Sequence, residues 1–144
     1  MRTKIMFGLL AVLGTGTAWA QGQEYCPATD AISQVGATYS APTADGEGQW
    51  YGVAAAGAGQ VQAFTEGVFR AHETSSKGVV HGEILRCSYT LQGGSSLDMR
   101  FKQPGTLVSI DDTQGWEQWH TQYFCENPEA TACRFTELKR PARG

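Results

Sequence analysis

The chain has 144 residues, of which 41% are hydrophobic and 17% charged, and its formal net charge is −3. This length and composition are typical of one small globular domain. The acidic balance argues against binding to nucleic acid or to anionic membrane surfaces, because both select for clusters of lysine and arginine.

The first twenty residues have the pattern of a secretory signal peptide. Arg2 and Lys4 precede an apolar run over 5–13, and 18–20 (AWA) is an A-x-A cleavage site. The apolar run is shorter than the roughly 20 residues of a membrane-spanning helix, although an uncleaved anchor is an alternative. We predict cleavage after residue 20, which leaves one exported domain over 21–144 with no stable membrane anchor. Loss of the two basic residues changes the net charge from −3 to −5.

All four cysteines follow this cleavage site, at Cys26, Cys87, Cys125 and Cys133. An even number of cysteines in a small exported chain predicts two disulfides, for which three pairings are possible. We favour Cys26–Cys87 and Cys125–Cys133, because the second pair encloses a short polar loop and the first ties the start of the domain to a central strand. A zinc site is the alternative, but there is no C-x-x-C pair, so we expect no metal and no cofactor.

The segment before residue 60 predicts two short strands. Residues 21–31 read as irregular with one helical turn capped by Thr29 or Asp30, and a weakly alternating strand over 35–41 ends before Pro42. The turn at 43–48 leads to a second strand. That strand covers 49–54, and the Gly/Ala-rich stretch 54–59 follows it as a mobile loop or, alternatively, a tight bend against another backbone.

The central part of the chain predicts a long β-hairpin. The stretch 78–91 is rich in β-prone residues, and a turn at Gly93 and Gly94 connects it to 97–102, where apolar and polar residues alternate. On the first strand, Leu85, Cys87, Tyr89 and Leu91 are expected to share the buried face. The preceding segment 61–74 fits a strand or an amphipathic helix. Gly67 favours the strand, with 67–72 pairing to the hairpin across the turn at 75–78.

The remaining elements complete an all-β pattern. We predict a strand over 106–110, a loop over 111–115, a strand over 116–125 with Trp119, Tyr123 and Cys125 on one side, a strand over 133–138 and a flexible basic tail over 139–144. The fold class is therefore mainly β: a small antiparallel sandwich or curled sheet of about seven or eight short strands, held by two disulfides.

Catalytic patterns are weak. His72, His81 and His120 lack the spacing of metal ligands, and no G-x-S-x-G nucleophile motif is present. A small hydrolase using His81 or His120 with Glu83 or Asp111 is an alternative, but we favour a protein without catalytic machinery.

Aromatic residues suggest a binding surface instead. Trp116, Trp119 and His120, if exposed beside Asp111 and Asp112, form the predicted partner-binding patch, although core packing is the alternative for each tryptophan. Acidic groups beside aromatic rings suit a basic protein or a cationic ligand. We therefore interpret the chain as a periplasmic or secreted protein that binds another protein, such as an immunity protein or inhibitor that neutralises a toxin or enzyme. A structural accessory of an envelope or secretion system is the alternative.

Several short motifs follow the predicted cleavage site. The chain has a C-P start at 26–27, a C-S-Y strand at 87–89 and a late cysteine pair, together with the region 48–50, Trp116 and 133–135 (CRF). In these motifs it resembles small exported bacterial proteins of a domain-of-unknown-function family. The resemblance covers most of the chain after residue 20. It implies export and two disulfides, and it implies no activity.

Overall fold

The computed structural model describes residues 22–74 and 78–139. The predicted signal peptide at 1–20 and the tail at 140–144 lie outside the described residues, as does most of the predicted turn at 75–78. The described chain forms eleven strands and two single 3₁₀ turns. Their bounds are β1 Gln23–Tyr25, η1 Thr29–Ala31, β2 Ser33–Val35, β3 Thr38–Pro42, β4 Gln49–Val53, β5 Val61–Thr74, β6 Val80–Leu91, β7 Ser96–Phe101, β8 Val108–Ile110, β9 Glu117–Trp119, β10 Gln122–Cys125, η2 Ala130–Ala132 and β11 Arg134–Glu137. No helix among them is long and apolar enough to cross a membrane.

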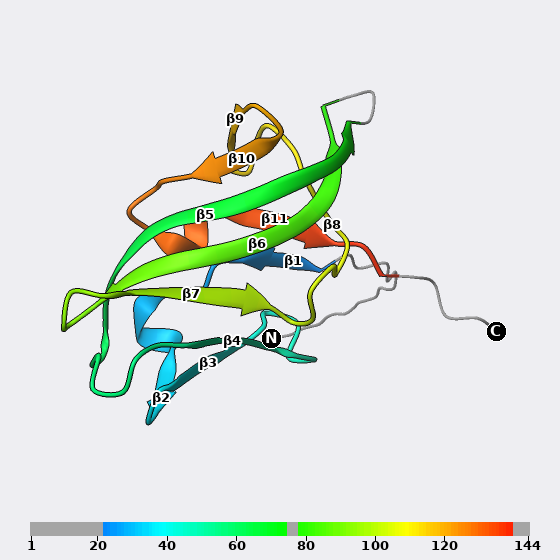
Figure 1. The fold of residues 1–144 in the computed structure, drawn as a ribbon. Helices are drawn as coiled ribbons and strands as arrows, with labels where there is room; N and C mark the ends of the chain where they lie inside the picture. The colour runs from blue at the N-terminus through cyan, green and yellow to red at the C-terminus, as the bar shows by residue number, and fades with distance from the viewer. Residues whose placement is uncertain (1–21, 75–77, 140–144) are drawn as a thin grey trace, which may run out of the picture.

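The long hairpin of β5 and β6 organises the sheet (Figure 1). The second edge of β6 is divided between two partners: residues 80–82 pair with β8, and residues 87–90 pair with β7. From β8 the sheet continues through β11 to β1, and from β7 it continues through β4 and β3 to β2. On the other side, β5 pairs with β10, which pairs with β9. Every pairing is antiparallel, so the predicted fold class is confirmed as a curled antiparallel sheet.

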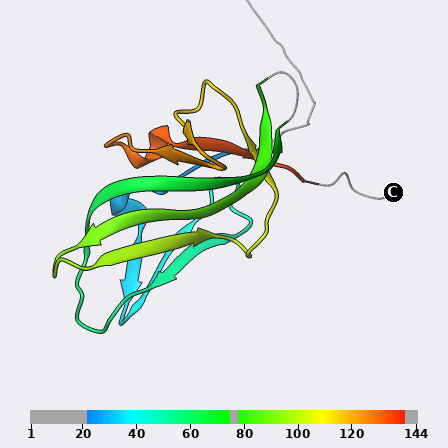
Figure 2. The ribbon, with the colours of Figure 1, turned by 45° about the horizontal axis from the view of Figure 1, so that its top comes forward.

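The hairpin bends because its register shifts at four places along β5 and β6. Figure 2 shows the resulting curvature of the two long strands. The bend brings the two halves of the sheet together over one core. Trp50 of β4 and Phe101 of β7 lie 5.1 Å apart between ring centroids, and both rings pack against Phe135 of β11, at 6.1 and 5.0 Å. The aromatic core therefore joins strands that are far apart in the sequence.

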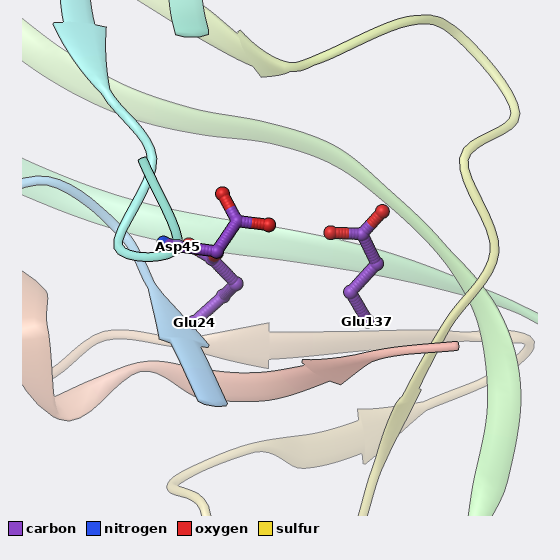
Figure 3. A group of neighbouring side chains, drawn as sticks. All are labelled: Glu24, Asp45 and Glu137. Carbon is purple, nitrogen blue, oxygen red and sulfur yellow. The ribbon is translucent and has the colours of Figure 1, made fainter. Parts of the chain in front are cut away.

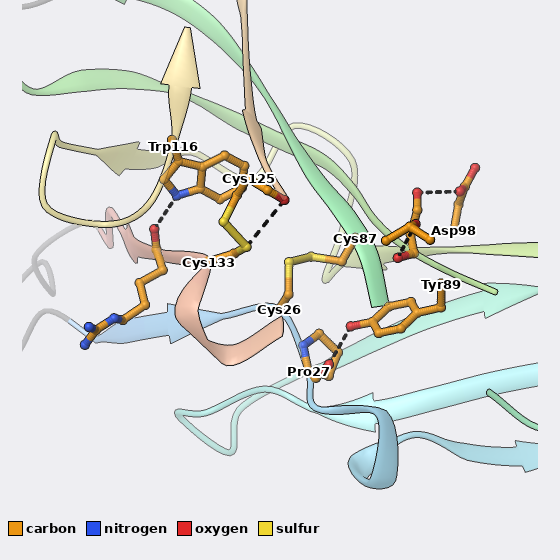
Figure 4. The surroundings of a disulfide bond; sticks show 11 residues. Cys26, Pro27, Cys87, Tyr89, Asp98, Trp116, Cys125 and Cys133 are labelled. Atoms are coloured by element: carbon orange, nitrogen blue, oxygen red, sulfur yellow. Dashed lines mark hydrogen bonds between the residues drawn. A yellow bond between two sulfur atoms is a disulfide. The ribbon is translucent and has the colours of Figure 1, made fainter. Parts of the chain in front are cut away.

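The structure contains two disulfides, and both have the predicted pairing (Figure 4). Cys26 and Cys87 connect the end of β1 to the middle of β6, and Cys125 and Cys133 connect the end of β10 to the start of β11. The first bridge lies beside Tyr89, whose hydroxyl donates to the carbonyl of Pro27 at 2.5 Å. Disulfides of this kind indicate an oxidising location outside the cytoplasm.

Several expectations are confirmed. The segment 61–74 is a strand, 49–53 is a strand, and the turn at 29–31 is helical. In β7, Leu97, Met99 and Phe101 are buried while Asp98 and Arg100 are exposed, as their alternation predicts. Tyr89 and Leu91 are buried in β6 as expected. Leu85 is not, because a register shift in β6 places Ile84 on the buried face instead.

Other boundaries were wrong. The predicted strand over 35–41 is two strands, β2 and β3, because Gly36 adopts a left-handed φ of 62° and turns the chain. The irregular start contains β1, which pairs with β11. The stretch 54–59 follows the alternative interpretation: Ala58 is buried, and its carbonyl accepts a hydrogen bond from Gly93 at 3.0 Å, so this bend is pressed against the β6–β7 turn.

Candidate functional site

A groove of about 610 Å³ lies beside the β9–β10 hairpin. We call it the acidic groove, and it is lined by Glu66, Gly115, Glu117, Gln118, Trp119, Phe124, Glu126 and Asn127. The hairpin exists because the chain reverses at His120 and Thr121, with Glu117 of β9 opposite Phe124 of β10 and Trp119 opposite Gln122. Opposed residues of an antiparallel pair project to the same face. Glu117, Trp119 and Phe124 therefore share one face of the hairpin.

The aromatic part of the groove is accessible. Trp119 is 64% exposed, its ring centroid is 6.4 Å from that of Phe124, and His120 packs edge-on against it at 4.2 Å. On the opposite face of the hairpin, Tyr123 packs edge-on against the buried Phe69 of β5 at 5.7 Å. One face thus anchors the hairpin to the core and the other presents an exposed indole.

The charged part of the groove is negative. Glu66, Glu117 and Glu126 are among its eight lining residues, and no lysine or arginine is. Glu66 is partly neutralised by Arg86, whose guanidinium lies 3.5 Å from it and 4.0 Å from Asp98. Within the described parts of the chain, Glu117 and Glu126 form no ion pair, and both are exposed. The groove therefore presents a negative potential that a bound cation could neutralise.

Gly115, one of the lining residues of the groove, is held in place by packing. Gly115 has a φ of 97° and lies so close to η2 that a Cβ there would be 2.9 Å from the carbonyl oxygen of Ala132. The next residue, Trp116, is buried at 8% exposure, and its indole N–H donates to the carbonyl of Arg134 at 2.7 Å (Figure 4). The Cys125–Cys133 bridge holds the end of β10 against the same segment. These contacts restrain the groove as a preformed site.

The structure separates the residues of the predicted patch. Trp119 and His120 lie together at the tip of the β9–β10 hairpin, and only Trp119 lines the groove. Trp116 is buried, in agreement with the alternative of a core role for this tryptophan. Asp111 and Asp112 lie in the loop after β8, where the Asp111 carboxylate accepts hydrogen bonds from the backbone N–H and the hydroxyl of Thr113. This aspartate caps its own turn.

Sequence reasoning missed the three glutamates. Glu117 and Trp119 are two residues apart in one short strand, so they project to the same face. The prediction of one continuous strand over 116–125 obscured this pattern. Trp119 and Tyr123 consequently project to opposite faces, where the sequence analysis expected one side. Glu66 and Glu126 come from β5 and from the segment after β10. They meet Glu117 only through the β5–β10–β9 pairing.

A second charged cluster lies at the opposite part of the fold, around Lys102. The ammonium of Lys102 donates to Glu137 at 2.7 Å and to Asp45 at 3.0 Å, and Lys139 reaches Asp45 at 3.0 Å. Glu24 completes this group, which we call the lysine–carboxylate cluster. Its carboxylate, 1% exposed, accepts the backbone N–H groups of Ala44 and Asp45 at 2.9 and 3.1 Å. Lys139 was expected to begin a flexible tail, but these contacts hold it.

The three carboxylates of this cluster converge from β1, the β3–β4 turn and β11 (Figure 3). Their oxygens lie within 4.8 Å of one another, a spacing that could hold a metal ion. Lys102 already bonds two of these carboxylates, so an ammonium group supplies the compensating positive charge. The cluster therefore joins the two halves of the sheet electrostatically, and we assign it a structural role.

The pKa values in this cluster follow from its contacts. Burial raises the pKa of Glu24, since two backbone hydrogen bonds only partly offset the loss of solvent. Burial alone would also raise the pKa of Asp45. Hydrogen bonds from Thr43, from the backbone of Glu47 and from the two lysines outweigh it and hold that pKa well below its usual range. Hydrogen bonds to Glu137 and Asp45 likewise raise the pKa of Lys102 against the opposing effect of burial.

Two of the three histidines, His72 and His81, lie near acidic residues on β5 and β6. His72 and Arg70 both contact the same carboxylate oxygen of Glu83 at 2.9 Å, and these contacts lower the pKa of Glu83. His81 lies 3.9 Å from Glu73. Glu83, one of the residues in the alternative hydrolase hypothesis, therefore contacts His72 and Arg70 through a side chain that is 14% exposed.

Comparison with known proteins places the chain in a family. No curated protein and no solved structure matches it. A family model described as "Protein of unknown function (DUF3757)" matches residues 21–136, which include both disulfides, the acidic groove and nearly all of the described strands. The chain belongs to this family of proteins of unknown function.

Proposed function

We propose that this protein is an exported, non-catalytic binding protein, located in the periplasm or secreted, whose acidic groove binds a basic segment of another protein. The observation that carries the proposal is the groove itself, which is lined by three glutamates and an exposed tryptophan and by no basic residue. Exposed tryptophans are uncommon on protein surfaces outside binding sites, and they contribute strongly to interfaces.

The chemistry of the groove suits a cationic side chain. An exposed ion pair contributes about 0.2–1 kcal/mol, and a cation over an exposed indole about 0.5–1 kcal/mol. Glu117, Glu126 and Trp119 can act on one ligand at the same time because they line one groove. The groove therefore favours a lysine or arginine through several modest contacts, and the packing that restrains its lining residue Gly115 reduces the entropy lost on binding.

A binder of this kind would neutralise a toxin or an enzyme if the basic segment it covers belongs to the partner's own functional site. Such an immunity or inhibitor role is consistent with a small, disulfide-bonded domain that presents an acidic groove. Its expected sign is the loss of the partner's activity in a stoichiometric complex.

The proposal is tested by titrating the oxidised protein with a capped heptapeptide in which arginine and threonine alternate, using calorimetry at low and high salt. We expect weak, salt-sensitive binding, since exposed charge interactions are screened. The double variant Glu117→Gln/Glu126→Gln should bind about 2- to 30-fold more weakly, the equivalent of about 0.5–2 kcal/mol.

The matched control is the double variant Glu47→Gln/Glu73→Gln, which also removes two exposed carboxylates, one from the β3–β4 turn and one from β5, both outside the acidic groove. It should leave the affinity unchanged. The proposal fails if the peptide does not bind, or if the groove variant and the control variant bind it equally well.

A further inference from the structure

The acidic groove is bordered by a free sheet edge. Among the strands that the structure describes, β9 pairs with β10 alone, and all three of its residues are exposed. In an antiparallel pair the backbone groups of alternate residues point toward the partner and away from it. Part of the N–H and C=O groups of β9 therefore point to the unpaired side, which is a template for an added strand.

The geometry of β9 predicts which side chains an added strand would place in the groove. A residue opposite Glu117 or Trp119 would project to the same face as these two residues, because opposed residues share a face. That face carries the groove carboxylates, including Glu66 and Glu126. The intervening residues of the added strand would project to the opposite face, away from the side chains of Glu117 and Trp119. Basic side chains are therefore favoured at every second position and not at consecutive ones.

Because β9 is short, an added strand needs both backbone hydrogen bonds to β9 and charge interactions with the groove. Three residues offer too few backbone hydrogen bonds to hold an extended peptide alone, and short edge strands normally resist unwanted pairing for this reason. Attraction between basic side chains and the carboxylates of the adjoining groove supplies the binding free energy that these few hydrogen bonds do not provide. An edge strand beside a groove of one charge thus selects for an extended and basic partner segment.

We propose that the protein recognises an extended segment of its partner that has basic residues at alternate positions, and that this segment pairs with β9 as an additional strand of the sheet. This inference rests on the proposed function of the acidic groove, and it adds the conformation and the sequence pattern of the ligand.

The test uses the same arginine–threonine heptapeptide in three further forms. Two carry backbone N-methyl groups, either on the arginines or on the threonines, and the third has the same composition with its arginines consecutive. Strand addition requires that one methylated series lose affinity at least tenfold while the other retains it, because only alternate N–H groups face β9. The form with consecutive arginines should bind several-fold more weakly than the alternating one.

Amide hydrogen exchange supplies the second measurement. In the complex, exchange should slow in β9 at Gln118 but not at Gln34 of β2, which lies at the other end of the sheet. Equal effects of the two methylated series, protection at β2 in place of β9, or equally tight binding of free arginine amide would each overturn strand addition while leaving cation binding by the groove intact. Failure of the unmodified peptide to bind would instead overturn the proposed function itself.

Discussion

At the scale of single residues, Lys102 combines two unusual properties. It is one of two non-glycine residues among the described ones with a left-handed backbone, at a φ of 53°, and its ammonium bonds two largely buried carboxylates. A left-handed lysine is unfavourable without compensation. The contacts to Asp45 and Glu137 provide that compensation, because they tie the end of β7 to the β3–β4 turn and to β11.

Replacing Lys102 with methionine should destabilise the fold by about 2–4 kcal/mol, since it leaves the partly buried Glu137 without its counter-charge and leaves Asp45 with Lys139 alone. The pKa of Asp45 is depressed, so its share of the stability is complete above its ordinary pKa near 4 and is lost as the pH falls through its lower value. The pKa of Lys102 is raised, so its share is complete below about pH 10 and is lost as the pH rises beyond its raised value.

The difference in unfolding free energy between the wild type and Lys102→Met, measured by urea denaturation, should therefore be largest between about pH 4 and pH 10 and shrink outside that window. Lys139→Met serves as the comparison. Lys139 contacts Asp45 and Glu47, but it is more exposed, so its replacement should cost much less stability. A similar loss for both variants would argue that burial of the cluster is unimportant.

At the scale of elements, the close approach of β5 and β6 depends on glycine. A Cβ at Gly82 would lie 2.0 Å from the carbonyl oxygen of Arg70 and 2.8 Å from the ring of Phe69. The backbone oxygen belongs to the paired strand and cannot move aside. Gly82→Ala should therefore cost at least about 3 kcal/mol or prevent folding. The comparison is Gly22→Ala, where no atom lies within 4 Å of the added carbon; equal denaturation midpoints for the two variants would contradict this account.

The strands and hairpins differ in how well the sequence predicts them. The alternation in β7 reports its buried face directly, because a strand has a period of two. The reversal at His120 and Thr121 carries no glycine or asparagine, so the β9–β10 hairpin has no turn signature, and its left-handed residue is a histidine with a φ of 60°. The pairing of β1 with β11 joins opposite ends of the chain. No local pattern encodes such a contact, and the acidic groove depends on contacts of the same non-local kind.

At the scale of the whole molecule, the sheet closes through distant contacts that the disulfides reinforce. The Cys26–Cys87 bridge spans 61 residues and the Cys125–Cys133 bridge spans 8. Because each bridge lowers the entropy of the unfolded chain by closing a loop, we expect them to stabilise the fold by about 4 and about 2.5 kcal/mol, respectively. A domain of this size is typically stable by only about 5–15 kcal/mol, so the two bridges supply a large fraction of its stability.

We therefore expect the reduced protein to be marginally folded. The chain should be reduced in denaturant, returned to buffer with reductant and followed by calorimetry, since all four cysteines are fully buried in the native fold. The oxidised form should melt cooperatively, and the reduced form should melt at a much lower temperature or without a cooperative transition. Cys125→Ala/Cys133→Ala, which keeps the longer bridge, should fall between them. If the fully reduced chain melted cooperatively at the temperature of the oxidised form, packing across the two halves of the sheet would be sufficient by itself, and the bridges would add little to the fold.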